Sequence, residues 1–71
     1  MKVKKVKFEM KSNNEEKVFI THRNVEDCKL KVRTIFLNDD LKTIKIIYDN
    51  NKGETFNYKD VKNLEYVHLQ L

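Results

Sequence analysis

The chain has 71 residues, a net charge of +4 and no proline, alanine or tryptophan. This length allows one small domain, residues 1–71, whose core is close to the lower size limit for independent stability. Leu, Ile, Val and Phe together number 22, which is enough for a folded chain even though 37% of the residues are charged. No apolar run approaches the roughly 18 residues of a membrane span, so we expect no membrane contact.

A single cysteine, Cys28, excludes an intrachain disulfide and favours a reducing compartment. The first residues lack the continuous apolar stretch of a signal peptide. We therefore expect a cytoplasmic protein. Because the chain has no disulfide, the domain must rely on its core or on association with a partner subunit.

The whole charge excess lies in residues 1–11, where five lysines stand against Glu9, and residues 12–71 carry ten charges of each sign. A localised basic segment attracts an anionic partner, such as nucleic acid or an acidic protein surface. Alternatively, the lysines keep an edge strand from pairing with other chains.

The dominant pattern is the alternation of apolar and polar residues with a period of two, which predicts β-strands. These segments are rich in β-branched and aromatic residues, and clusters of Asn and Asp separate them. The predicted strands span residues 3–11, 16–22, 28–37, 41–49 and 54–59. Between the second and third strands, residues 23–27 are compatible with a helical turn capped by Asn24.

The last segment, residues 60–71, is compatible with two structures. One is a helix capped by Asp60, and the other is a turn at 60–63 followed by a strand. The β-prone run Tyr66-Val67-His68-Leu69 favours the strand. We therefore predict an all-β fold, a small antiparallel meander of five or six strands. Curling into an SH3-like or OB-like barrel would cover the edges of such a small sheet.

Three hairpin registers keep one apolar face inward. They place Phe8 opposite Ile20, Val32 opposite Ile46 and Tyr48 opposite Phe56. The first two hairpins then have three-residue loops at 13–15 and 38–40. In the third, Gly53 takes the left-handed position that closes the turn.

A second apolar set, which includes Ile35, Leu37 and Ile47, is out of phase with this inward face. A bulge that switches the buried face of a coiled sheet would explain it. The other interpretation is an exposed apolar interface for a second copy or another protein.

The register of the first hairpin gathers cations around one outward aromatic ring. The candidate partner-binding residues are Lys5, Lys7, Lys11, Lys17, Phe19 and Arg23. Two like-charge pairs, Lys11/Lys17 and Lys5/Arg23, would lie directly opposite each other, and an anionic partner would relieve their repulsion. Phe19 would stack on an unpaired base. Against nucleic acid, lysine outnumbers arginine by 13 to 2, and no established nucleic-acid-binding motif is present.

Residue types that carry chemistry are scarce. His22, Cys28 and His68 are too few and too far apart for a structural zinc site. A single glycine excludes a phosphate-cradling loop, and a chain this short has little room for a pocket with convergent polar groups. We therefore expect no enzyme activity, no metal and no cofactor.

Two functional hypotheses follow. The first is a non-catalytic module that binds a protein partner, including a second copy of itself as a homodimer. Abundant Lys, Asn and Ile without Ala or Pro is typical of an AT-rich coding sequence, which suggests a phage or mobile-element inhibitor of a host protein. The alternative is a small barrel that binds single-stranded nucleic acid through the basic outer face of the first hairpin.

Overall fold

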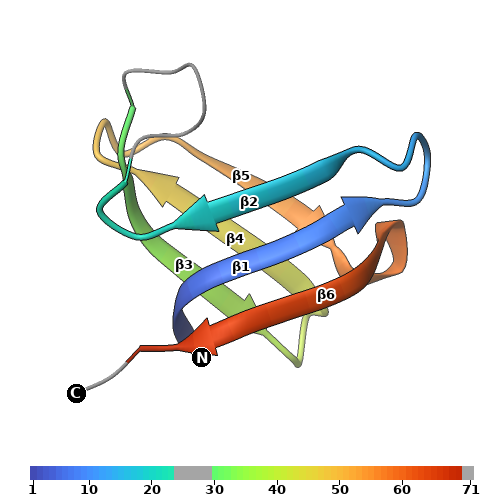
Figure 1. The fold of residues 1–71 in the computed structure, drawn as a ribbon. Helices are drawn as coiled ribbons and strands as arrows, with labels where there is room; N and C mark the ends of the chain where they lie inside the picture. The colour runs from blue at the N-terminus through green and yellow to red at the C-terminus, as the bar shows by residue number, and fades with distance from the viewer. Residues whose placement is uncertain (24–29, 70–71) are drawn as a thin grey trace.

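The structure is a computed structural model that describes residues 1–23 and 30–69. Within these residues the chain forms six antiparallel strands and one 3-10 turn (Figure 1). The elements are β1 (Lys2–Met10), β2 (Glu16–Ile20), β3 (Val32–Asn38), β4 (Thr43–Tyr48), β5 (Gly53–Asn57), η1 (Tyr58–Asp60) and β6 (Val61–His68). The prediction of a small antiparallel β domain is confirmed, and so is a strand, not a helix, near the C-terminus. Cys28, the Asn24 cap and the start of the predicted strand 28–37 lie outside the described residues.

The strands form one sheet that curls into a half-barrel of two layers. Its order is β2-β1-β3-β4-β5, and β6 pairs with β1. In Figure 1, β2, β1 and β6 form the layer nearer the viewer, and β3, β4 and β5 lie behind them. Only β3, β4 and β5 follow one another as a meander.

Strand β1 belongs to both layers. Its first residues, Lys2 and Val3, pair with β3, and residues 5–9 pair with β2. On its other side β1 pairs with β6 from Val3 to Met10. The basic strand is therefore central in its layer, so edge protection does not account for its lysines.

The core lies between the two layers. Its buried residues are Val3, Val6, Phe8, Phe19, Val32, Ile35, Leu37, Ile44, Ile46, Tyr48 and Val61. The ring centroids of Phe8, Phe19 and Phe56 lie 5.0–6.2 Å apart, which joins β1, β2 and β5 in one aromatic cluster. Burial of each large apolar side chain contributes roughly 1.5–3 kcal/mol, so this cluster is a major source of stability.

The predicted register of the first hairpin is wrong by three residues. Phe8 lies opposite Lys17 rather than Ile20, and Val6 lies opposite Phe19. The loop contains four residues, Lys11–Asn14, and Asn14 has the left-handed conformation (φ 59°). Because an odd shift exchanges the two faces of a strand, Phe19 is buried (5% exposed) instead of pointing outward.

The second hairpin shows the same kind of shift. Its loop also has four residues, 39–42, and Leu37 lies opposite Ile44. A register irregularity between Val32 and Thr34 changes the phase of β3, so Val32, Ile35 and Leu37 are all buried. The bulge interpretation of the out-of-phase apolar set is therefore confirmed for Ile35 and Leu37. An apolar interface at Ile35 and Leu37 is wrong, because both belong to the core; Ile47 is half-buried.

The third hairpin has a three-residue loop, 49–51, and its predicted register is wrong, because Phe56 lies opposite Ile44 rather than Tyr48. Asn51 (φ 67°), not Gly53, takes the left-handed conformation, and no glycine has a positive φ. Gly53 instead lies opposite Ile47 at a close approach of two strands. A Cβ atom at Gly53 would lie 2.5 Å from the Ile46 carbonyl oxygen, so steric crowding explains why glycine occupies this position.

Candidate functional site

Of the six predicted binding residues, only two lie together on an exposed face. Lys5 and Lys7 alternate with the buried Val6 and Phe8, so their side chains project from the outer side of β1. The corrected register places Ile20 opposite Lys5 and Val18 opposite Lys7. The predicted like-charge pairs Lys11/Lys17 and Lys5/Arg23 are therefore absent from the hairpin.

The other four predicted residues are separated. Phe19 is in the core, and Lys17 shares its side of β2 and contacts Glu15 at 3.3 Å. Lys11 lies in the loop before β2, and its backbone N–H donates to the Asp60 carbonyl. Arg23 is exposed beyond the opposite end of β2. The predicted cluster of cations around Phe19 is therefore wrong.

The face that replaces it consists of the outward side chains of β2, β1 and β6, and we call it the outer face. Its residues are Lys5, Lys7, Glu9, Glu16, Val18, Ile20, Glu65 and Val67. In Figure 1 this layer faces the viewer, and no other strand lies in front of it. No described strand therefore covers this face.

Two rows of side chains cross the outer face. In one row Lys7 lies between Val18 and Glu65, and Lys7 Nζ is 3.9 Å from a Glu16 oxygen. In the other row Lys5 lies between two branched apolar side chains, Ile20 and Val67. Within residues 1–23 and 30–69 the Lys5 ammonium has neither an ion pair nor a side-chain hydrogen bond. Lys5 is thus an uncompensated cation in an apolar row.

The alternation pattern of the sequence does not predict the apolar residues of the outer face. Val18 is 40% exposed and Val67 is 48% exposed, whereas Val18 and Ile20 were predicted to point inward. Their exposure follows from the four-residue loop that shifts the register, and the alternation alone does not reveal that loop. The pairing of β6 with β1 then brings Val67 next to Lys5.

A shallow hollow of about 290 Å³ lies along the β6 side of the outer face. Its lining includes Lys5 and Lys7 from β1 and Glu65, Tyr66 and Val67 from β6. The Tyr66 ring is 44% exposed and contacts the His68 ring edge-on at 5.3 Å. An exposed aromatic ring and two lysines therefore border the same hollow.

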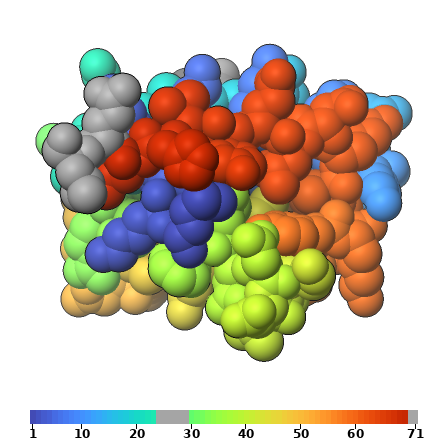
Figure 2. Space-filling view, turned by 90° about the horizontal axis from the view of Figure 1, so that it is seen from below, coloured from blue at the N-terminus to red at the C-terminus, as the bar shows by residue number. Residues whose placement is uncertain are grey.

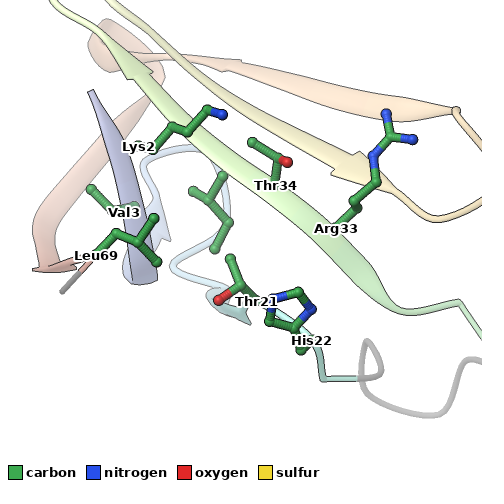
Figure 3. Close-up of a pocket in the computed structure, with 8 residues that line it drawn as sticks. Lys2, Val3, Thr21, His22, Arg33, Thr34 and Leu69 are labelled. Carbon is green, nitrogen blue, oxygen red and sulfur yellow. The ribbon is translucent and has the colours of Figure 1, made fainter. Parts of the chain in front are cut away.

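A second hollow of about 180 Å³ lies where β1 passes from β3 to β2 (Figure 3). Basic and hydroxyl side chains line it, but they do not converge. Arg33 points away from Thr21 and His22 in Figure 3, and its Nη1 donates to Asn51 Oδ1 at 2.6 Å. Thr21 Oγ1 donates to the Lys4 carbonyl. This arrangement lacks the paired acid and base that a reaction centre needs.

Titratable side chains form no candidate metal site in the described part of the chain. His22 and His68 are both exposed, and no three His, Cys, Asp or Glu residues gather there. Burial raises the pKa of the Tyr58 phenol above its usual value, and its hydrogen bond to Asp39 at 3.1 Å raises it further. Tyr58 stabilises the fold at the β3–β4 loop and is not part of the outer face. No helix among the described residues could cross a membrane.

Comparison with models of protein families, with curated proteins and with solved structures finds no match for this chain.

Proposed function

We propose that the protein is a non-catalytic interaction module that binds an acidic protein surface through its outer face. The observation that carries this proposal is the unpaired Lys5 ammonium between Ile20 and Val67. A partner carboxylate surrounded by apolar side chains would match this row in both charge and polarity. Removal of water from the apolar neighbours would strengthen the attraction between the two charges.

The surrounding charges favour the same class of partner. The chain is basic overall, and its whole excess lies in residues 1–11, which include Lys5 and Lys7. Long-range attraction would therefore speed the approach of an acidic protein. Inhibition of a host protein by a phage or mobile-element product is one biological setting for such a module, and it rests on composition alone.

The test compares two triple variants with equal changes in charge. The face variant carries Lys5→Glu, Lys7→Glu and Val18→Asp. The control variant carries Lys45→Glu, Lys52→Glu and Leu41→Asp, which change exposed positions on β4 and on the loops beside it. Each immobilised protein is exposed to a lysate of the native host, with and without nuclease, and the retained proteins are identified by mass spectrometry.

We expect a defined acidic protein that wild type and the control variant retain, that the face variant loses, and that nuclease does not release. Equal retention by the two variants would refute the proposal, because the outer face would then be irrelevant. The folding of both variants is checked by circular dichroism before the comparison.

A second candidate function is binding of single-stranded nucleic acid. The hollow that Tyr66 shares with Lys5 and Lys7 favours it, because stacking on an aromatic ring beside cations is how such strands are bound. Tyr66 would take the role that was predicted for Phe19. Binding of nucleic acid would weaken steeply between about 50 and 200 mM salt, whereas a protein contact that buries mainly apolar surface would not. Recovery that depends on intact nucleic acid would select this candidate.

A further inference from the structure

One edge of β6 has no partner strand. Among the described residues β6 pairs only with β1, so its other side offers unpaired backbone groups. Figure 2 shows β6 crossing one face of the molecule in full view, with the start of β1 beside it. Natural proteins protect such edges with charged residues, proline, bulges or a covering element.

The two halves of β6 differ in this protection. The first half contains Lys62, Asn63 and Glu65, and a register irregularity falls where it pairs with Lys7 and Glu9. In the second half the pairing with β1 is also irregular, between Val3 and Lys5, but the extra residue lies in β1, and this half of β6 contains no charged residue and no proline. The stretch from Tyr66 to Leu71 is the longest in the chain without Asp, Glu, Lys or Arg.

The second half, together with Leu69 directly after it, is also apolar and accessible. Tyr66, Val67 and Leu69 are each 44–48% exposed, and His68 is exposed too. The other edge strands of the described sheet, β2 and β5, are more polar. Strand β2 begins with Glu16 and Lys17, and β5 contains Glu54, Thr55 and Asn57. An uncharged, exposed apolar edge is a site where another strand adds to a sheet.

We propose that this edge pairs in an antiparallel direction with the same edge of a second copy, which makes the protein a symmetric dimer. Antiparallel pairing of identical strands about a twofold axis requires only that the segment be compatible with itself. The segment meets this requirement because it brings no like charges together, although the chain as a whole is basic. A charged partner would gain no electrostatic attraction at this edge, because the edge itself carries no charge.

Successive side chains of β6 point to opposite faces of the sheet, and this alternation limits how two copies of the strand can pair. A twofold axis perpendicular to the sheet requires one residue to lie opposite itself, and Val67 is central in the exposed part of the edge. Tyr66 of one copy then lies opposite His68 of the other. The two rings, which already contact each other within one strand, would pack across the junction. The outer faces of both copies lie on the same side of the joined sheet.

This inference does not rest on the proposed acidic partner. Its first test is sedimentation velocity on wild type, Val67→Lys, Leu69→Lys and the control Leu41→Lys. Leu41 is 71% exposed in the loop between β3 and β4, and neither of these strands pairs with β6. Each variant is first checked for folding by circular dichroism.

We expect wild type and Leu41→Lys to form particles of twice the 8.6 kDa chain. Val67→Lys should dimerise at least about tenfold more weakly, because two lysines would face each other at the junction. Leu69→Lys would instead face Glu65 of the other copy, so like-charge repulsion should not weaken its dimer. A monomeric wild type at about 1 mM, or a Val67→Lys variant that dimerises like the control, would overturn the proposal.

A second test introduces cysteine instead of lysine at the edge, which perturbs the fold less than a buried or opposed charge does. Val67→Cys and Leu41→Cys are each made in a Cys28→Ser background and oxidised mildly. Opposed residues of antiparallel strands lie about 4.5–5.5 Å apart at Cα, which a disulfide can bridge. Val67→Cys should form covalent dimers at least about tenfold faster than Leu41→Cys. Equal rates would refute a twofold axis at Val67.

Discussion

Replacement of Phe19 by alanine tests the register of the first hairpin, which decides the position of the outer face. In the structure Phe19 is 5% exposed, and its ring lies 6.2 Å from that of Phe8 and 6.0 Å from that of Phe56. Truncation of a buried phenylalanine costs about 3–5 kcal/mol, and each aromatic pair contributes about 0.5–1.5 kcal/mol beyond its buried area. Because β2 is an outer strand that can relax, we expect about 3 kcal/mol.

That loss is large for a chain of this size. At the usual 0.05–0.15 kcal/mol per residue, the free energy of unfolding is about 4–11 kcal/mol. Phe19→Ala is therefore expected to remain partly unfolded without denaturant or to unfold at a much lower urea concentration. Phe19→Leu keeps most of the apolar volume and loses the ring contacts, so about 1–2 kcal/mol is expected.

The assay is urea unfolding followed by circular dichroism and tyrosine fluorescence, with Val18→Ala as the matched control on the same strand. Val18 is 40% exposed, so its truncation should cost less than about 0.5 kcal/mol. If Phe19→Ala and Val18→Ala had equal small effects, Phe19 would be at the surface. The register and the outer face described above would then both be wrong.

Three further predictions concern the loops and the strand contacts. Gly53→Ala should destabilise the fold by about 2 kcal/mol in urea unfolding, because its Cβ atom would collide with the Ile46 backbone; an unchanged midpoint would contradict the close approach. Lys42→Gly should stabilise it by about 0.5 kcal/mol, since Lys42 has a left-handed backbone (φ 57°); a loss of stability would show that this strain is absent. The raised pKa of Tyr58 means that the unfolded state releases its phenolic proton first as the pH rises. Stability should thus decrease above pH ~10, where a free tyrosine ionises, and ultraviolet titration of Asp39→Asn should show a lower Tyr58 pKa than wild type.

Much of the fold could be predicted from alternation, because period-two apolar patterns and Asn- and Asp-rich turns reflect local chemistry. The strands and their antiparallel hairpins follow from these patterns. Register depends on loop length, and four-residue loops are compatible with the same turn residues as three-residue loops. Asn14 and Lys42 take left-handed conformations that a preference for glycine does not indicate.

The candidate site was harder to predict because it depends on pairings between distant parts of the chain. The importance of Lys5 and Lys7 follows from the clustering of lysine near the N-terminus, and both lie on the outer face. The wrong position of Phe19 follows directly from the odd shift in register. Val67 becomes a neighbour of Lys5 only through the pairing of β6 with β1, and no local pattern encodes this pairing.

The pairing of the first strand with the last has a consequence for how the chain reaches its native state. Even the nearest pair between β1 and β6, Met10 and Val61, lies 51 positions apart in the chain. Closing so long a loop is entropically unfavourable until many contacts compensate, which makes such topologies slow to fold. While the ribosome is still making the later strands, one side of the lysine-rich β1 has no partner. Its dense positive charge would then resist aggregation of the nascent chain, a benefit that is independent of any role in the finished protein.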